Sequence, residues 1–105
     1  MSIWNITAMN GYIPKTTFWN DFEVADLFGP FAVQETYNTA MREWASDYEF
    51  LTELVLVLNH RLWLHYGAKN EKLAKLYDGL WREASDYALK HLKDDELRYY
   101  LEVTD

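Results

Sequence analysis

The chain contains no cysteine. A disulfide framework, a thiolate zinc site, an iron–sulfur cluster and a cysteine nucleophile are therefore excluded together, because each of them needs a cysteine sulfur. The sequence also lacks a stretch of about 20 apolar residues that could span a bilayer, and residues 1–15 lack the basic start and apolar run of a signal peptide. We therefore expect a cytoplasmic protein that makes no membrane contact.

Glycine and proline are scarce, with four and two residues. There is no Gly-x-Ser-x-Gly elbow, no glycine-rich loop that would cradle a phosphate, no fixed-period repeat and no low-complexity tract. A length of 105 residues is typical of one domain. We predict a single helical domain over residues 1–105, with residues 1–15 as an N-terminal arm and residues 16–105 as a helical bundle. We predict no cofactor.

Basic residues are outnumbered by acidic ones, which gives a net charge of −7. Direct binding of DNA or RNA is not expected, because it depends largely on Lys and Arg. The charge is uneven: residues 16–60 hold eight acids and one base, Arg42, whereas residues 61–93 hold seven bases and four acids. This asymmetry is compatible with attraction between the two halves of a monomer, with pairing of two copies, or with an acidic face for a basic partner.

Apolar residues make up half of the chain, and they recur mostly with helical spacing. Phe18, Phe22, Ala25 and Phe28 form such a stripe, and the Gly29-Pro30 pair marks a helix boundary. Phe50 to Tyr66 is apolar on all sides, which indicates a central helix with several neighbours. The helices that we predict are Thr17–Phe28, a second helix that carries Val33 to Tyr48, then Phe50–Tyr66, Asn70–Leu92 and Asp94–Leu101.

The fold class that follows is all-α, a compact bundle of four to five helices with a short extended or hairpin N-terminal arm. Ser46 and Glu49 have the spacing of a capping box, which predicts a restart of the helix there. Asn70 and Asp94 are expected to cap the last two helices. The clearest periodicity in the chain lies between these two caps and runs from Leu73 to Leu92.

Glu49, Glu53 and His60 share one helical face, since they lie at i, i+4 and i+11. They are weak candidates for a metal or acid/base site. A di-metal bundle would usually show Glu-x-x-His pairs on facing helices, and that spacing does not occur in this chain. We therefore interpret the three residues as the solvent-facing stripe of a buried helix.

The aromatic residues, 17% of the chain, serve either the core or an interface. Trp44, Trp63 and Trp81 lie on or beside the predicted core stripes. The candidate interaction residues lie toward the ends of their elements, and they are Trp4, Trp19, Tyr99 and Tyr100.

The chain also resembles small helical proteins found in mobile elements of gut bacteria. The segments that carry this resemblance are Thr17-Phe18-Trp19, Asp21-Phe22, Ala25-Asp26, Phe28-Gly29, Leu51-Thr52-Glu53-Leu54-Val55, Leu76-Tyr77, Leu80-Trp81 and Thr104-Asp105. The resemblance implies an accessory role in a phage or conjugative element, and it implies neither a reaction nor a ligand.

Three functional hypotheses follow. The first is a non-enzymatic interaction or accessory module that binds a protein partner or associates with itself, with a homodimer as the simplest form. The second is an acidic inhibitor or nucleic-acid mimic that binds a basic protein. The third is a metal-dependent enzyme that uses Glu49, Glu53 and His60, and it has the least support.

Overall fold

The computed structural model describes residues 13–104, and this part of the chain is helical apart from its connections. The predicted all-α bundle is confirmed for these residues. The proposed hairpin or extended arm falls mainly on residues 1–12, which lie outside the described part. The helices are α2 (Phe18–Phe28), α3 (Pro30–Trp44), α4 (Tyr48–Gly67), α5 (Glu71–His91) and α6 (Asp94–Thr104).

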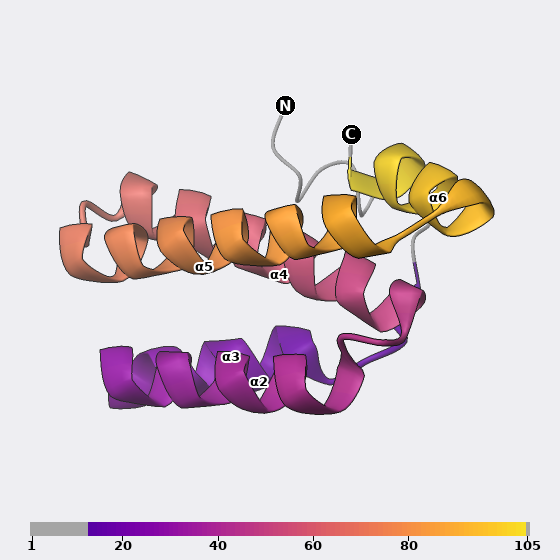
Figure 1. Ribbon diagram of the computed structural model, residues 1–105. Helices are drawn as coiled ribbons and strands as arrows, with labels where there is room; N and C mark the ends of the chain where they lie inside the picture. Colours follow the sequence, from indigo (N-terminus) through magenta and orange to yellow (C-terminus); the bar gives the residue numbers. More distant parts are fainter. Residues whose placement is uncertain (1–12, 105) are drawn as a thin grey trace.

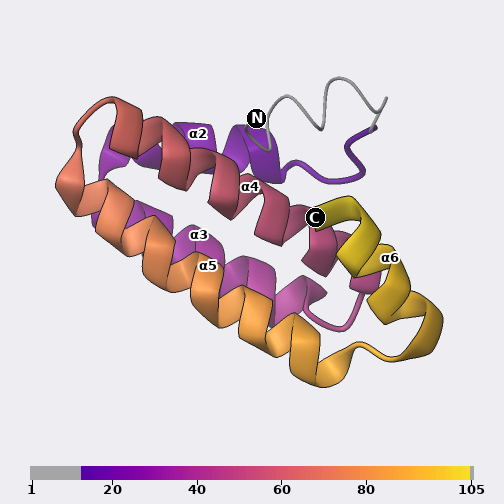
Figure 2. The ribbon, with the colours of Figure 1, turned by 90° about the horizontal axis from the view of Figure 1, so that it is seen from above.

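The helices form two layers (Figure 1). The α2–α3 hairpin makes one layer, and the antiparallel pair α4 and α5 makes the other. Helix α6 lies across one end of the second layer, next to the start of α4 (Figure 2). The α2–α3 turn and the α4–α5 turn lie together at the opposite end, and both views show this. We call this opposite end the bundle tip.

The Gly29-Pro30 pair separates α2 from α3, as the sequence predicts. Gly29 has φ +108°, which is costly for any residue with a Cβ atom, and its N–H donates to the Ala25 carbonyl. Pro30 occupies the first turn of α3, where the missing N–H has no helical partner to lose. The chain therefore reverses direction with only Gly29 between the two helices.

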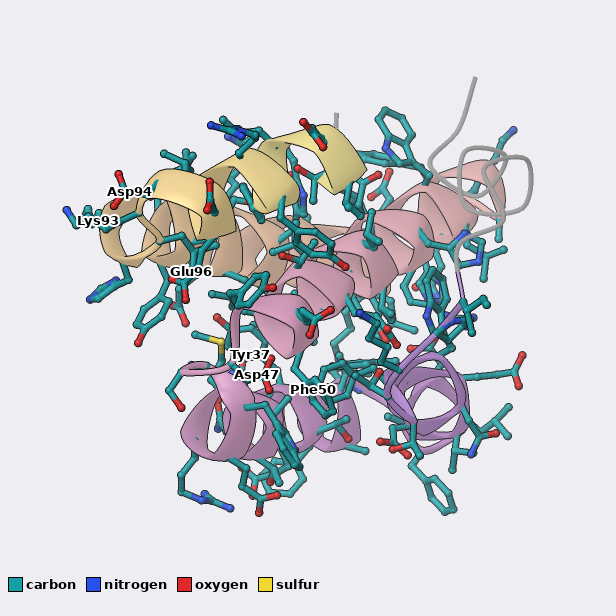
Figure 3. The ribbon with its side chains drawn as sticks, turned by 90° about the vertical axis from the view of Figure 1, so that its right-hand side faces the viewer. Tyr37, Asp47, Phe50, Lys93, Asp94 and Glu96 are labelled. Carbon is teal, nitrogen blue, oxygen red and sulfur yellow. The ribbon has the colours of Figure 1, made fainter. Side chains whose placement is uncertain are left out.

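Helix α4 begins one residue after its true cap, Asp47, whose carboxylate accepts hydrogen bonds from the backbone N–H groups of Glu49 and Phe50. The predicted capping box of Ser46 and Glu49 is therefore wrong, because Asp47 supplies the cap. Figure 3 shows Asp47 at the turn between the layers, and it shows Lys93, Asp94 and Glu96 where α6 begins. Asn70 caps α5 as predicted, since its side chain accepts from Leu73 N–H.

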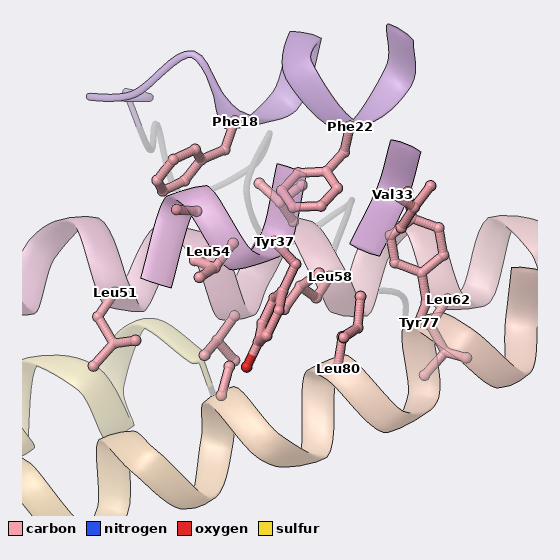
Figure 4. Close-up of a cluster of buried hydrophobic side chains, with 14 of the residues drawn as sticks. Phe18, Phe22, Val33, Tyr37, Leu51, Leu54, Leu58, Leu62, Tyr77 and Leu80 are labelled. Atoms are coloured by element: carbon pink, nitrogen blue, oxygen red, sulfur yellow. The ribbon is translucent and has the colours of Figure 1, made fainter. Parts of the chain in front are cut away.

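The core lies between the layers (Figure 4). Leu51 to Leu58 are all buried, which confirms that α4 has neighbours on several sides. Phe18 and Phe22 project from α2 toward α4, and Tyr37 and Tyr77 fill the space between the layers. Helix α5 contributes the inner stripe that its periodicity predicts: Leu73, Tyr77, Leu80, Ala84 and Ala88 are buried.

Three predicted core positions are wrong. Phe28 is 79% exposed, because the chain reverses at Gly29 before another helix can cover it. Trp44 is the last residue of α3 and is 40% exposed, and Trp63 is 57% exposed because it lies about 100° around α4 from the buried Leu62. Trp81 does pack partly against the core. No helix in residues 13–104 combines the length and apolar character that crossing a bilayer requires.

Candidate interaction site

A surface groove of about 550 Å³ lies between α2 and α3. Its apolar part comes from Phe18, Val24, Ala40 and Trp44. The helices form this groove because α2 and α3 turn their large apolar side chains, such as Phe22 and Tyr37, toward α4 and α5. Smaller and polar side chains are left on the outer face of the hairpin.

The groove has a distinctly acidic lining. Asp21, Glu35 and Glu43 contribute carboxylates, and no Lys or Arg is among its lining residues. Asp21 accepts a hydrogen bond from the Thr17 hydroxyl, which holds one of the carboxylates in place. None of the three acids forms an ion pair with another described residue. The groove therefore combines apolar surface with negative charge that lacks a cationic partner within residues 13–104.

A separate polar cluster lies inside the bundle, between α2, α4 and α5. The Asp26 carboxylate accepts from Nε and Nη2 of Arg61, with an Nε distance of 3.0 Å. It also lies 2.7 Å from Nε2 of His65 and accepts from the Tyr77 hydroxyl. The Asp26, Arg61 and His65 side chains are only 8, 11 and 9% exposed. We call these four residues the Asp26 network.

The Asp26 network satisfies its polar groups internally. Since a carboxylate only accepts hydrogen bonds, Nε2 of His65 must carry a proton in this contact. Burial, followed by the hydrogen bond to Asp26, raises the pKa of Tyr77 far above its usual value. The His65 and Tyr77 rings also stack, with centroids 5.5 Å apart. This geometry is that of a structural clamp between the two layers.

Glu53 is fully buried, so its assignment to a solvent-facing stripe is wrong. Its carboxylate accepts from the backbone N–H groups of Lys15 and Thr16, at 2.7 and 3.2 Å, and from the Thr16 hydroxyl. These donors lie just before α2. Glu53 therefore holds the segment that leads into α2 against the middle of α4.

The other two candidates from that helical face have different surroundings. Glu49 is partly exposed and pairs with the Lys15 ammonium group. His60 is half-buried and packs against the Trp19 ring, with centroids 5.6 Å apart. In residues 13–104 no group of three or more His, Asp or Glu side chains is arranged to hold a metal ion. Glu49 and Glu53 both contact the segment that precedes α2.

His60 gives a testable pH dependence. Burial, and secondarily the nearby Arg61 charge, lowers the pKa of His60 below its ordinary value of 6.5. As the pH falls below 6.5 the unfolded chain takes up a proton that the folded chain resists, so the free energy of unfolding should fall. We expect this loss to be smaller in His60→Gln, as measured by urea unfolding at several pH values. An NMR titration that places the His60 pKa above 6.5 would contradict the argument.

The predicted interaction residues have different positions. Trp4 lies outside the described part of the chain. Trp19 is partly buried, and its Nε1 is the only buried side-chain nitrogen or oxygen of residues 13–104 that lacks a hydrogen-bond partner. Tyr99 is also partly buried, edge-on to Tyr48. Tyr100 is only 4% exposed and packs against the core, and it lines a hollow of about 110 Å³ with Trp81 and Thr104.

Comparison of the chain with protein-family models, with curated proteins and with solved structures gives no match.

Sequence reasoning missed both the groove and the Asp26 network. One signal for the network was present: Arg61 and His65 lie at i and i+4 in the second half of a helix that is largely apolar. Two adjacent basic groups on such a helix call for a buried acid. The acid itself, Asp26, lies 35 residues away from Arg61 in the chain, and nothing in its local pattern distinguishes it from the other acids.

Proposed function

We propose that the chain is a non-enzymatic interaction module whose α2–α3 groove binds a basic, partly apolar segment of a partner protein. The observation that carries this proposal is the lining of the groove, which offers Asp21, Glu35 and Glu43 beside Val24 and Trp44 without any lysine or arginine. A positively charged segment would meet three carboxylates there. Its apolar side chains would replace water on Phe18, Val24 and Trp44.

The dimensions of the groove support a short segment as the ligand. A volume of about 550 Å³ accommodates a few side chains, whereas the rest of a bound helix would lie on the surface between α2 and α3. Amphipathic helices bind in this way, with apolar anchors on one face and charged groups toward the rim. Trp44 is well suited as an anchor, because tryptophan is enriched among residues that dominate binding energy.

A binding role also agrees with the buried polar side chains outside the groove, because their polar groups are already hydrogen-bonded within the chain. The Asp26 network pairs its members with one another, and Glu53 is occupied by the chain before α2. Neither group opens into the groove. A basic ligand fits the inhibitor hypothesis as well, in which the carboxylates of the hairpin occupy the basic surface of another protein. An accessory role in a mobile element remains part of the proposal and is supported by the sequence resemblance alone.

The groove proposal predicts charge-selective peptide binding. The probe is a synthetic amphipathic helix with lysines on one face and leucines on the other, compared by titration calorimetry with a peptide in which glutamates replace the lysines. We expect the lysine peptide alone to bind. Asp21→Asn combined with Glu43→Gln should weaken this binding roughly fivefold, since each exposed ion pair contributes modestly.

The matched control removes the same charge from another surface. Asp95→Asn with Glu102→Gln neutralises two exposed acids on α6, and this variant should bind the lysine peptide as the wild type does. An equal loss in both variants would show that the peptide responds to net charge and not to the groove. Binding of the glutamate peptide with similar affinity would also overturn the proposal.

A further inference from the structure

The bundle tip carries the three most exposed large apolar side chains of residues 13–104. Leu27, Phe28 and Phe31 flank the Gly29-Pro30 turn and are 83, 79 and 78% exposed. They are exposed because α2 ends at Phe28 and α3 begins at Pro30. Neither helix extends far enough to cover the side chains at the turn. We call these three residues the knuckle. A cluster of this kind on a small protein typically marks an interaction surface.

The other layer adds further apolar surface at the same end. Trp63, Leu64 and Tyr66 lie in the last turns of α4 and are 57, 45 and 55% exposed. The two layers meet there, because Asp26, one residue before Leu27, contacts His65 at 2.7 Å. Beside these residues is a hollow of about 200 Å³, lined by His65, Tyr66, Lys69, Glu71 and Ala74. The tip thus presents a projection on one layer and a hollow on the other.

Charge follows the same division between the layers. Glu23 and Glu35 lie one helical turn behind Leu27 and Phe31, and both acids are exposed. Lys69, Lys72 and Lys75 lie on the α4–α5 turn and the start of α5, where they are exposed and outnumber the one exposed acid beside them, Glu71. None of these six side chains forms an ion pair with a described residue.

We propose that the bundle tip binds a second copy of the same chain in a twofold-symmetric dimer. A twofold axis across the tip would turn the α2–α3 layer of one copy toward the α4–α5 layer of the other. The knuckle of each copy then faces the hollow of its partner, and Glu23 and Glu35 face the lysines. A surface that carries a projection with acids on one side and a hollow with bases on the other is self-complementary under this rotation.

The exposed area of the tip agrees with a dimer. Large apolar side chains have accessible areas of about 150–250 Å², so the exposed fractions of these six residues amount to roughly 800 Å². That is about the area that each partner contributes to a stable protein–protein interface. The dimer shares only Glu35 with the lining of the α2–α3 groove, so variants at Asp21 and Glu43 test the groove and variants at Phe28 and Phe31 test the tip.

Sedimentation equilibrium over a wide dilution series tests the dimer. The wild type should pass from monomer to dimer and not beyond. Phe28→Ser with Phe31→Ser should raise the dissociation constant at least about a hundredfold, since both side chains would be anchors of the interface. The control is Leu89→Ser with Leu101→Ser, which removes apolar residues that are 53 and 48% exposed on other surfaces. This control should dimerise like the wild type.

Charge exchange tests the twofold arrangement itself. Lys69→Glu with Lys72→Glu makes both sides of the tip acidic, and Glu23→Lys with Glu35→Lys makes both sides basic. Each double variant should dimerise more weakly than the wild type, and a mixture of the two should form a heterodimer, because an acidic side then meets a basic side at both contacts. Failure of the mixture to associate more strongly than either variant alone would overturn the twofold model.

Three further outcomes would overturn the proposal. A wild type that stays monomeric at the highest concentration would exclude self-association through the tip. An open series of oligomers would show contacts that do not close into a dimer. Binding of a monomeric wild type to phosphatidylcholine vesicles, lost in Phe28→Ser with Phe31→Ser, would identify the tip as a lipid-binding surface instead.

Discussion

Asp26→Ala is expected to lower the free energy of unfolding by about 3–5 kcal/mol, because it removes the acid from a buried ion pair and leaves the Arg61 charge uncompensated. His65 and Tyr77 lose a hydrogen-bond partner in the same step. A small domain is stable by only about 5–15 kcal/mol, so this variant should be close to unfolding at room temperature. Urea unfolding monitored by circular dichroism measures the difference.

Two comparisons identify the cause of that loss. Asp21→Ala removes an acid from the same helix, in a more exposed position near its start, and should cost about 1 kcal/mol or less. Asp26→Leu combined with Arg61→Met replaces the ion pair by apolar groups, and it should be less destabilised than Asp26→Ala alone. If the double replacement is the less stable variant, the unpaired Arg61 charge is not the main cause of the loss in Asp26→Ala, and the explanation given for that loss is wrong.

Much of the fold could be predicted from local patterns, because local patterns determine helix ends and inner faces. The α5 stripe and its Asn70 cap follow from spacing within one helix, and the Gly29-Pro30 turn follows from the backbone preferences of two residues. The N-cap of α4 is Asp47 and not the predicted Ser46, a difference of one residue, because these adjacent residues have similar capping ability.

The groove and the bundle tip could not be predicted in the same way, because they depend on where helices meet. The groove needs α2 and α3 to be paired, and the knuckle exists because Phe28 belongs to a periodic stripe whose helix ends at that residue. Phe28 alone carries no signal that distinguishes an exposed ring from a buried one. The two halves of the bundle tip come from turns that are nearly 40 residues apart in the chain.

Glu53 shows a different limit of sequence reasoning. On a helix that is apolar all round, a charged residue lies either on the one open stripe or against a specific partner. Two of the partners of Glu53 are backbone N–H groups, those of Lys15 and Thr16, and every residue except proline has such a group. No side-chain pattern could therefore indicate that this glutamate is buried.

Glu53→Ala should reduce the free energy of unfolding by about 3 kcal/mol, because it leaves buried backbone donors without an acceptor and removes a side chain from the packed interior. Glu53→Gln keeps the shape of the side chain and one accepting oxygen, so we expect an intermediate loss. The matched control is Glu49→Ala, one turn earlier on the same helix. Its partly exposed pair with Lys15 should contribute about 1 kcal/mol or less.

A second measurement separates this local role from general destabilisation. Glu53 holds the segment before α2, so the amide protons of Lys15 and Thr16 should exchange faster in Glu53→Ala than in a core variant of equal global stability, such as Leu80→Ala. Equal losses of stability in Glu49→Ala and Glu53→Ala, or unchanged exchange at Lys15, would contradict the assignment. The order of the three variants matters more than any single value, because they differ in burial and in the number of donors that lose their acceptor.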